Sequence, residues 1–401
     1  MTKQKEMFVG IDTSKNSHQV SFHNPTEIKK DLKIGNNREG FEELTKRLKS
    51  YRSEGYRMKV ACEPTGHYWE NLGYKLKEEN FELKLINPFH TSRYKEIFDN
   101  TPQKDDVKDS RIIAQLLRQG NTLHENLPKG PYAELRELTN QREDLLEEKS
   151  RLRNKLDKWL DRHFPEYPKL FSELFGKTCL GILKEYMGPE KINEASLDKL
   201  TEKVISLSHG KLREERAKEI KDRAEETIGH TIAPKAAQVR LLHLLTRIDS
   251  FQERINKVEE MIDQRLDELE QSTYLQSIPG VGWWGAAVFL GEVGDPTRLP
   301  RAKSVEKIAG LNLYRTQSGK TKSKLSITKR GRSTLRKVAY QLAVSGINNN
   351  REFSQFYERK LDRGKAKMSA LVALSAKILR VMYGVVKNEE NYRPLEERVD
   401  S

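Results

Sequence analysis

Apolar and polar residues divide this chain into a mixed first third and a helical remainder. Strands are predicted where short apolar runs are bounded by turn residues, at residues 7–13, 18–24, 27–35, 57–63 and 82–87. Helices are predicted where apolar residues recur three and four apart, over about 38–54, 67–79 and 106–119. The pattern therefore predicts an α/β domain over residues 1–125, with three consecutive strands followed by alternating helices and strands.

Longer helices are predicted in the middle of the chain. In the segment 132–163 apolar residues recur every seven positions, at Leu138, Leu145, Leu152 and Trp159. The segment 238–272 repeats this pattern. Both segments suit coiled-coil pairing, within the chain or between chains, and a plain helical bundle is the alternative. We therefore expect a helical coiled-coil region over residues 126–275 and a mostly α-helical C-terminal domain over residues 276–401.

Two glycine motifs in the C-terminal part look like nucleotide-binding signatures but do not meet their requirements. Residues 280–285 contain G-x-G-x-x-G, yet they follow a long predicted helix and Pro279 instead of a strand, which excludes a dinucleotide site. Pro-Gly-Val-Gly between two helices instead resembles a helix-hairpin-helix turn, which brings backbone amides to a phosphate. A simple tight turn is the alternative. Gly319-Lys320-Thr321 is not a phosphate-binding loop, because Tyr314 stands where the first glycine is required.

Four acidic residues occur where a divalent metal ion could be bound. Asp12 ends the first predicted strand and Glu63 ends the fourth, while Asp106 and Asp109 lie three apart at the start of a predicted helix. Hard cations prefer oxygen ligands, and paired ions can hold the attacking and leaving oxygens of a phosphodiester. The order of the elements, with acids at strand ends, is that of the RNase H/RuvC-like nucleases.

The charge of the chain favours a polyanionic partner. Its 73 Lys and Arg residues exceed its 59 Asp and Glu residues, which gives a formal net charge of +14. Residues 296–345 contain thirteen Lys and Arg and a single acid, Glu306. Such a segment favours nucleic acid through the release of counterions. The candidate nucleic-acid-binding residues are Arg315, Lys320, Lys322, Lys324, Lys329, Arg330 and Arg336.

Cysteine content and hydropathy indicate the compartment. Cys62 and Cys179 are too few and too far apart for a disulfide scaffold or a zinc ribbon, and they suit a reducing environment. The N-terminal residues include no apolar signal region, and no stretch of about 18 apolar residues is expected. We therefore expect a cytoplasmic protein that is not associated with a membrane.

The order and spacing of several motifs together resemble a known family. The chain resembles, over nearly its whole length, the transposases of the insertion-sequence-110 family, bacterial DEDD recombinases guided by a bridge RNA. The family usually has Thr at the position of Asp105 and Ala at the position of Ser110. The spacing to Asp109 favours Asp106, and not Asp105, as the acid that binds metal. The motifs that carry the resemblance are Gly10-Ile11-Asp12-Thr13-Ser14-Lys15, Glu63-Pro64-Thr65-Gly66-His67-Tyr68, Asn87-Pro88, Lys104-Asp105-Asp106-Val107-Lys108-Asp109-Ser110, Ile278-Pro279-Gly280-Val281-Gly282, Ala309-Gly310-Leu311, Ser318-Gly319-Lys320, Ile327-Thr328-Lys329-Arg330-Gly331 and Leu335-Arg336.

The resemblance implies roles for individual residues. A RuvC-like tetrad that holds Mg²⁺, for which Mn²⁺ could substitute, would consist of Asp12, Glu63, Asp106 and Asp109. Ser318, in the C-terminal transposase domain, would attack DNA and form a covalent phosphoserine intermediate. The partners would be donor and target DNA, a bridge RNA and further copies of the chain, in a dimer or tetramer where the serine of one protomer meets the acids of another. The protein would act in the bacterial cytoplasm, at the nucleoid.

Two other functions are compatible with the residues. The first is a metal-dependent nuclease that resolves DNA junctions by hydrolysis, in which Ser318 has no covalent role. The second is a nucleic-acid-binding protein with an inactive RuvC-like fold, against which the four intact acids argue. A covalent protein–DNA adduct would distinguish a transposase from a nuclease, and metal-dependent cleavage would distinguish both from a binding protein.

Overall fold

The computed structural model describes residues 5–64, 66–99, 105–124, 127–230, 232–316 and 324–394. The chain divides into two compact units, Met1–Pro128 and Lys129–Ser401. The first unit is built on a mixed sheet and the second is mostly helical, which confirms the predicted division into an α/β part and a helical part. The predicted middle and C-terminal regions both belong to the second unit.

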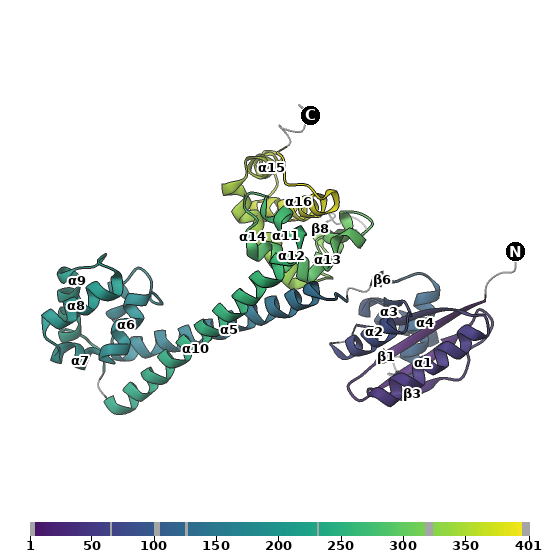
Figure 1. The fold of residues 1–401 in the computed structure, drawn as a ribbon, viewed down its shortest axis with the longest axis horizontal. Helices are drawn as coiled ribbons and strands as arrows, with labels where there is room; N and C mark the ends of the chain where they lie inside the picture. The colour runs from purple at the N-terminus through teal and green to yellow at the C-terminus, as the bar shows by residue number, and fades with distance from the viewer. Residues whose placement is uncertain are drawn as a thin grey trace. The chain divides into compact units, whose positions relative to one another are not determined.

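A mixed sheet with the strand order β3-β2-β1-β4-β5-β6 forms the centre of the first unit (Figure 1). Its first three strands are antiparallel neighbours: β1 (Glu6–Thr13), β2 (Ser17–His23) and β3 (Leu32–Gly35). On the other side of β1 the strands β4 (Arg57–Cys62) and β5 (Leu83–Leu85) are parallel to it, and β6 (Leu123–His124) closes the sheet in the antiparallel sense. All the predicted strands are present, whereas the two-residue β6 has no pattern that could predict it.

Helices cover both faces of this sheet. On one face, α1 (Arg38–Ser53) and α2 (Tyr68–Glu78) complete a core with Met7, Val9 and Ile11 of β1. On the other face, α4 (Asp106–Arg118) forms a second core with Phe8 of β1 and Ala61 of β4. A further helix, α3 (Pro88–Asp99), packs beside α4 and was not predicted. Side chains alternate along β1, so Phe8, Gly10 and Asp12 lie on the face that α4 covers.

Two long helices, α5 (Pro131–His163) and α10 (Pro234–Asp267), lie side by side in the second unit (Figure 1). They correspond to the predicted segments 132–163 and 238–272, although the second prediction runs past Leu269, where a separate helix, α11 (Glu270–Gln276), begins. One core forms around the C-terminal part of α5 and the N-terminal part of α10. It includes the short helix η1 (Tyr167–Leu170) and the helices α6 (Lys177–Tyr186), α7 (Pro189–Glu194), α8 (Leu197–Ser208) and α9 (Glu214–Glu225).

A second core forms at the opposite end of this helical pair. There the first turns of α5 pack closely against α12 (Trp283–Val293): Arg136 Nε donates to the backbone oxygen of Gly291 at 3.0 Å, and Leu135 and Leu138 join the core. The remaining elements are the short helix η2 (Pro296–Arg298) and the helices α13 (Lys303–Ala309), α14 (Ser333–Asn349), α15 (Arg351–Asp362) and α16 (Lys367–Asn388). These helices agree with the prediction that the C-terminal region is mostly α-helical.

Residues 313–327 differ from the sequence expectation of a basic loop. They include an antiparallel hairpin of β7 (Leu313–Thr316) and β8 (Lys324–Ile327). β8, Lys324-Leu325-Ser326-Ile327, does alternate polar and apolar residues, but four residues within a basic segment are too few for this pattern to identify a strand.

One helix, α16, is long and apolar enough to cross a membrane when judged by length and composition alone, with a mean hydropathy of 1.6. The expectation that no such stretch occurs is therefore wrong. Half of the apolar stretch is buried inside the structure, where Leu374, Ile378 and Met382 of α16 are fully covered. Packing in the C-terminal core accounts for the composition of this helix.

Candidate active site

Asp12 and Glu63 reach the same end of the sheet because β1 and β4 are parallel neighbours. Ile11 and Cys62 form the last residue pair between the two strands. Asp12 directly follows Ile11, and Glu63 directly follows Cys62. Asp12 lies on the α4 face of β1, as its alternation with Gly10 requires. The sheet thus places two of the predicted acids together at the edge where α4 begins.

Gly10 allows α4 to approach β1 unusually closely. A Cβ atom on Gly10 would lie 2.0 Å from the backbone oxygen of Ser110 and 2.4 Å from the backbone nitrogen of Ala114. Contacts of that length are sterically forbidden, so any side chain here would force α4 away from the strand. Glycine at this position therefore sets the distance between Asp12 and the first turn of α4, which contains Asp106 and Asp109.

Asp105 has a structural role at the start of α4. It is the N-cap residue, and its Oδ1 accepts a hydrogen bond from the backbone nitrogen of Val107 at 3.0 Å. This satisfies one of the amide groups that a helix N-terminus leaves without a partner. Asp106, by contrast, is among the charges that act on Asp12. Asp105 therefore caps the helix, whereas Asp106 acts on the charge of Asp12.

The four predicted acids lie close enough to affect ionisation at Asp12. Burial, followed by the charges of Asp109, Asp106 and Glu63, raises the pKa of Asp12 from an ordinary 3.8 to about 7, while Lys95 lowers it. Clustered like charges and loss of solvent both disfavour an ionised carboxylate. The structure therefore brings Asp12, Glu63, Asp106 and Asp109 together, as the sequence predicted.

The raised pKa of Asp12 predicts that Asp12→Asn stabilises the metal-free protein. The folded chain retains this proton up to about pH 7, whereas the unfolded chain releases it near pH 4, so stability falls as the pH rises between these values. Above pH 7 Asp12 is charged in the folded chain as well, and the full destabilisation of the fold by this buried charge is present. We expect Asp12→Asn to raise the melting temperature by a few degrees near pH 8 and by less near pH 5, as measured by thermal unfolding.

Asp105→Asn is the matched control for this measurement. Asp105 is exposed, and asparagine caps a helix as well as aspartate does, so its melting temperature should change little at either pH. A lower melting temperature for Asp12→Asn near pH 8 would contradict the argument.

The helix α3 supplies two partners of these acids that sequence reasoning missed. Thr91 Oγ1 donates to Glu63 Oε2 at 2.5 Å, and Lys95 Nζ lies 2.6 Å from Asp109 Oδ2. Thr91 and Lys95 are four residues apart and so project from the same side of the helix. Asn87, whose side chain accepts a hydrogen bond from the backbone nitrogen of Phe89, marks the start of this helix and was the available signal.

The chemistry of these residues fits a divalent metal ion, but their spacing requires adjustment. The donors are carboxylate oxygens, which hard cations prefer, and Asp109 Oδ1 is buried without a hydrogen-bond partner. Among the described residues, no group of three or more His, Cys, Asp and Glu side chains is close enough to hold an ion. An ion bound here therefore requires the carboxylates to move together and Lys95 to release Asp109.

A buried polar network holds α4 against β2. The hydroxyl oxygens of Ser110 and Ser21 are 2.8 Å apart, and Ser21 donates to Asp31 Oδ1 at 2.6 Å. Arg111 Nη2 lies 2.6 Å from the other oxygen of Asp31. Ser110, where the family usually has alanine, thus takes part in fixing the position of the helix that carries two of the acids.

The predicted nucleophile and part of the basic segment lie outside the described residues. Ser318, Lys320 and Lys322 belong to the connection between β7 and β8. Arg315 and Lys324 are in the two paired strands, at the end that this connection joins. The structure therefore places the frame of the predicted serine loop and leaves the role of Ser318 as a prediction.

The remaining predicted phosphate-binding residues follow β8. Lys329 and Arg330 are exposed. Arg336 is partly buried, and its Nη1 donates to the backbone oxygen of Ala309 at 2.9 Å. Arg336 thus ties the end of α13 to the start of α14, so part of its hydrogen-bonding capacity serves the fold.

The Pro-Gly-Val-Gly segment connects α11 and α12, as a turn between helices. Gly280 has a φ of +92°, which favours glycine, and a Cβ atom there would lie 3.1 Å from the Cα atom of Gly346 in α14. Close packing against α14 explains the first glycine of the motif, and this favours the tight-turn interpretation.

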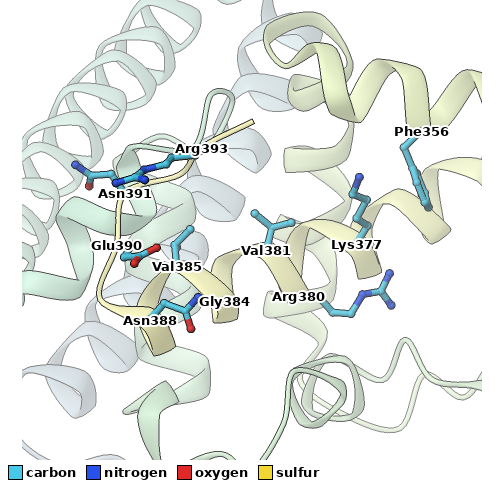
Figure 2. Close-up of a pocket in the computed structure, with 10 residues that line it drawn as sticks. All are labelled: Phe356, Lys377, Arg380, Val381, Gly384, Val385, Asn388, Glu390, Asn391 and Arg393. Carbon is cyan, nitrogen blue, oxygen red and sulfur yellow. The ribbon is translucent and has the colours of Figure 1, made fainter. Parts of the chain in front are cut away.

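A pocket of about 660 Å³ lies along α16 (Figure 2). Lys377 and Arg380 of α16 line it together with Glu390, Asn391 and Arg393 of the segment that follows the helix. Both cations already have carboxylate partners: Lys377 lies 2.6 Å from Glu352, and Arg380 contacts Glu306. The pocket includes none of the predicted site residues.

Comparison with family models shows matches to transposases at both ends of the chain. Residues 9–165 match an IS110-type DEDD model described as "Transposase", and residues 272–358 match a model described as "Transposase IS116/IS110/IS902 family". The first match includes all four predicted acids, and the second includes Ser318.

Curated proteins with similar sequences have related names. The chain is 25% identical over 292 residues to the "Insertion element IS110 uncharacterized 43.6 kDa protein" of Streptomyces coelicolor, and the aligned region covers 72% of each chain. It is 22% identical over 396 residues, 98% of each chain, to the pilin gene-inverting protein of Moraxella bovis. It is 30% identical over 209 residues to the putative transposase y4uE of Sinorhizobium fredii, which covers 50% of this chain and 57% of that protein.

Proposed function

Since this chain belongs to the IS110 family of transposases, we propose that it cuts and rejoins DNA strands to move an insertion sequence. The observation that carries this proposal is the gathering of Asp12, Glu63, Asp106 and Asp109, where burial, together with the charges of the other three acids, raises the pKa of Asp12 to about 7. A folded protein has no structural need for such a cluster, because it costs stability. A cation-assisted reaction at a phosphodiester does need it.

The first unit serves as a RuvC-like catalytic domain in this proposal. Its three antiparallel strands followed by parallel strands and helices, with acids at the strand ends, support that assignment. The four carboxylates would hold Mg²⁺, or Mn²⁺ in its place, and Thr91 orients Glu63 through its hydrogen bond. Such an ion would polarise the oxygens of the reacting phosphodiester.

Ser318 is the nucleophile in the second unit. Its Oγ bonds to phosphorus as the bond from phosphorus to the leaving sugar oxygen breaks. The hydroxyl proton passes to solvent, and the released sugar oxygen takes up a proton. Rejoining reverses these changes with a different sugar oxygen, so the number of phosphoester bonds is conserved and no energy source is needed. Nearby Lys320, Lys322 and Arg315 balance the charge that develops on the phosphate.

The basic charge of the chain serves two nucleic acids in this proposal, the DNA substrate and a bridge RNA that selects it. The chain acts as a dimer or tetramer in the bacterial cytoplasm. The serine of one protomer meets the acids of another, so that the two form one active site. Residues 9–165 and 272–358, which match the family, contain these two sets of residues separately.

Recombination of a plasmid that carries the reading frame with its flanking DNA tests this function. We expect the purified protein to produce recombinant junctions in the presence of Mg²⁺ and the RNA transcribed from the flanking DNA. Chelation of the metal or omission of the RNA should abolish them, as sequencing of the products would show. A plasmid that lacks the flanking DNA is the control. Cleavage without junctions, at branched DNA only, would indicate the hydrolytic junction nuclease instead.

A further inference from the structure

A groove of about 580 Å³ runs along the first half of α10, beside Lys155 of α5. We call this surface the α10 groove; the residues used in the argument are Lys155, Lys235, Val239, Arg240, His243 and Arg247. The members from α10 recur three to five positions apart and therefore share one face of that helix. Lys158 and Arg162 extend the basic side of α5, since they follow Lys155 at helical spacing and are exposed. Asp157 falls on the opposite side of α5 by the same spacing, whereas Asp161 lies beside Lys158, three residues after it and away from Lys155.

The positive charges of the α10 groove are not neutralised within the described part of the chain. Lys155, Lys235, Arg240 and Arg247 take part in no ion pair there, and residues 234–248 contain no acid. Elsewhere on this helical pair cations do have partners. Arg142 lies 2.7 Å from Glu259, for example. The α10 groove therefore combines cations that form no ion pair among the described residues with a segment, residues 234–248, that contains no acid, which gives it a local positive potential.

The dimensions and chemistry of the α10 groove fit the backbone of duplex DNA. Lys235 and Arg247 are twelve residues apart, which is about 18 Å along a helix. Duplex DNA carries one negative charge per about 1.7 Å of its axis, so a segment of that length presents roughly ten phosphate charges. No Phe, Tyr, Trp, Asn or Gln lines the α10 groove, so the large aromatic side chains on which bases stack and the amides that read adenine are absent from it, while its cations suit phosphates.

We propose that the α10 groove is a second DNA-binding surface, which holds duplex DNA through its phosphates without regard to sequence. None of its residues belongs to the candidate active site. The inference rests on the proposed function in one respect, because it takes DNA as the partner. The apolar side chain of Val239, which is half exposed, lines the groove with these cations.

The test compares two double variants of the full chain. Arg240→Gln with Arg247→Gln removes two charges from the α10 groove, and Arg254→Gln with Lys257→Gln removes two exposed charges from α10 outside it. Affinity for a labelled DNA duplex of arbitrary sequence is measured by fluorescence anisotropy over a range of salt concentrations. We expect the groove variant to weaken binding about tenfold and to reduce the slope of log affinity against log salt by about 2, since each phosphate contact contributes roughly 0.9. The control variant should bind like the wild type.

Each other outcome overturns the inference in a recognisable way. Equal losses in both variants would indicate a general effect of charge. A loss confined to an RNA duplex of the same length would make RNA the occupant, and a change in the mass of the particle in solution would make the groove a contact between copies. If the wild type binds no DNA, the proposed function fails. If the wild type binds DNA and the groove variant matches it, only the α10 groove fails. Unchanged melting temperatures establish that both variants fold.

Discussion

Asp12→Asn is expected to reduce DNA strand cleavage by about a hundredfold or more, the size of effect seen when one group that stabilises transition-state charge is removed. The same exchange is expected to raise the stability of the metal-free protein, because it removes the carboxylate whose pKa is raised to about 7. A more stable protein that has lost activity cannot have lost it by unfolding. Cleavage of labelled DNA in Mg²⁺ measures the first effect and thermal unfolding measures the second.

Metal binding gives an independent measurement of the same residues. Mg²⁺ should raise the melting temperature of the wild type, since a ligand that binds only the folded state stabilises it, and should have little effect on Asp12→Asn. Glu63→Gln, Asp106→Asn and Asp109→Asn should behave like Asp12→Asn in the cleavage assay. Asp105→Asn, which preserves the cap of α4, should retain both cleavage and the response to metal. Full cleavage by Asp12→Asn would rule out the proposed role of these carboxylates.

Ser318→Ala is expected to eliminate a covalent protein–DNA adduct while leaving affinity for DNA and RNA close to that of the wild type. The reason is that alanine removes the attacking oxygen but none of the positive charges around it. The adduct is detected as DNA that migrates with the protein under denaturing conditions. Mass spectrometry of protease digests should place the nucleotide remnant on Ser318.

Two serines in the same basic segment serve as controls for Ser318. Ser326 lies in β8, paired with Tyr314 of β7, and Ser323 precedes that strand. Ser326→Ala and Ser323→Ala should keep the adduct, because a hydroxyl that only contacts phosphate is replaceable. A remnant found on either of them would make that serine the nucleophile in place of Ser318, and 5′-phosphate ends with no adduct at all would favour the hydrolytic nuclease.

The acids of the first unit could be predicted because their positions follow from local rules. Asp12 and Glu63 each follow an apolar run, and parallel neighbouring strands end at the same edge of a sheet. Asp106 and Asp109 share the first turn of a helix whose apolar periodicity is clear. The close approach of that helix depends on Gly10, whose significance appears only when α4 is seen packed on β1.

Features that depend on contacts between distant segments were not predictable. The helix α3 has a weakly amphipathic sequence, so Asn87 at its start is its one sequence signal, and the contacts of Thr91 and Lys95 with the acids could not be anticipated. The hairpin of β7 and β8 consists of two four-residue strands that pair through their backbones, and strands this short give too little pattern to be recognised. The α10 groove combines Lys155 with residues about 80 positions later, and each of these cations taken alone resembles an ordinary exposed residue.

The contact between Arg136 and Gly291 has a consequence for how the chain is made. These residues are 155 positions apart, and a ribosome adding roughly 5–20 residues per second needs about 8–30 s to pass from one to the other. The first unit ends at Pro128 and can fold during this interval, whereas Leu135 and Leu138 must wait for α12 to emerge. The nascent chain therefore exposes an apolar face of α5, to which chaperones can bind. The unit that carries the acids is complete before the segment that contains Ser318 has been synthesised.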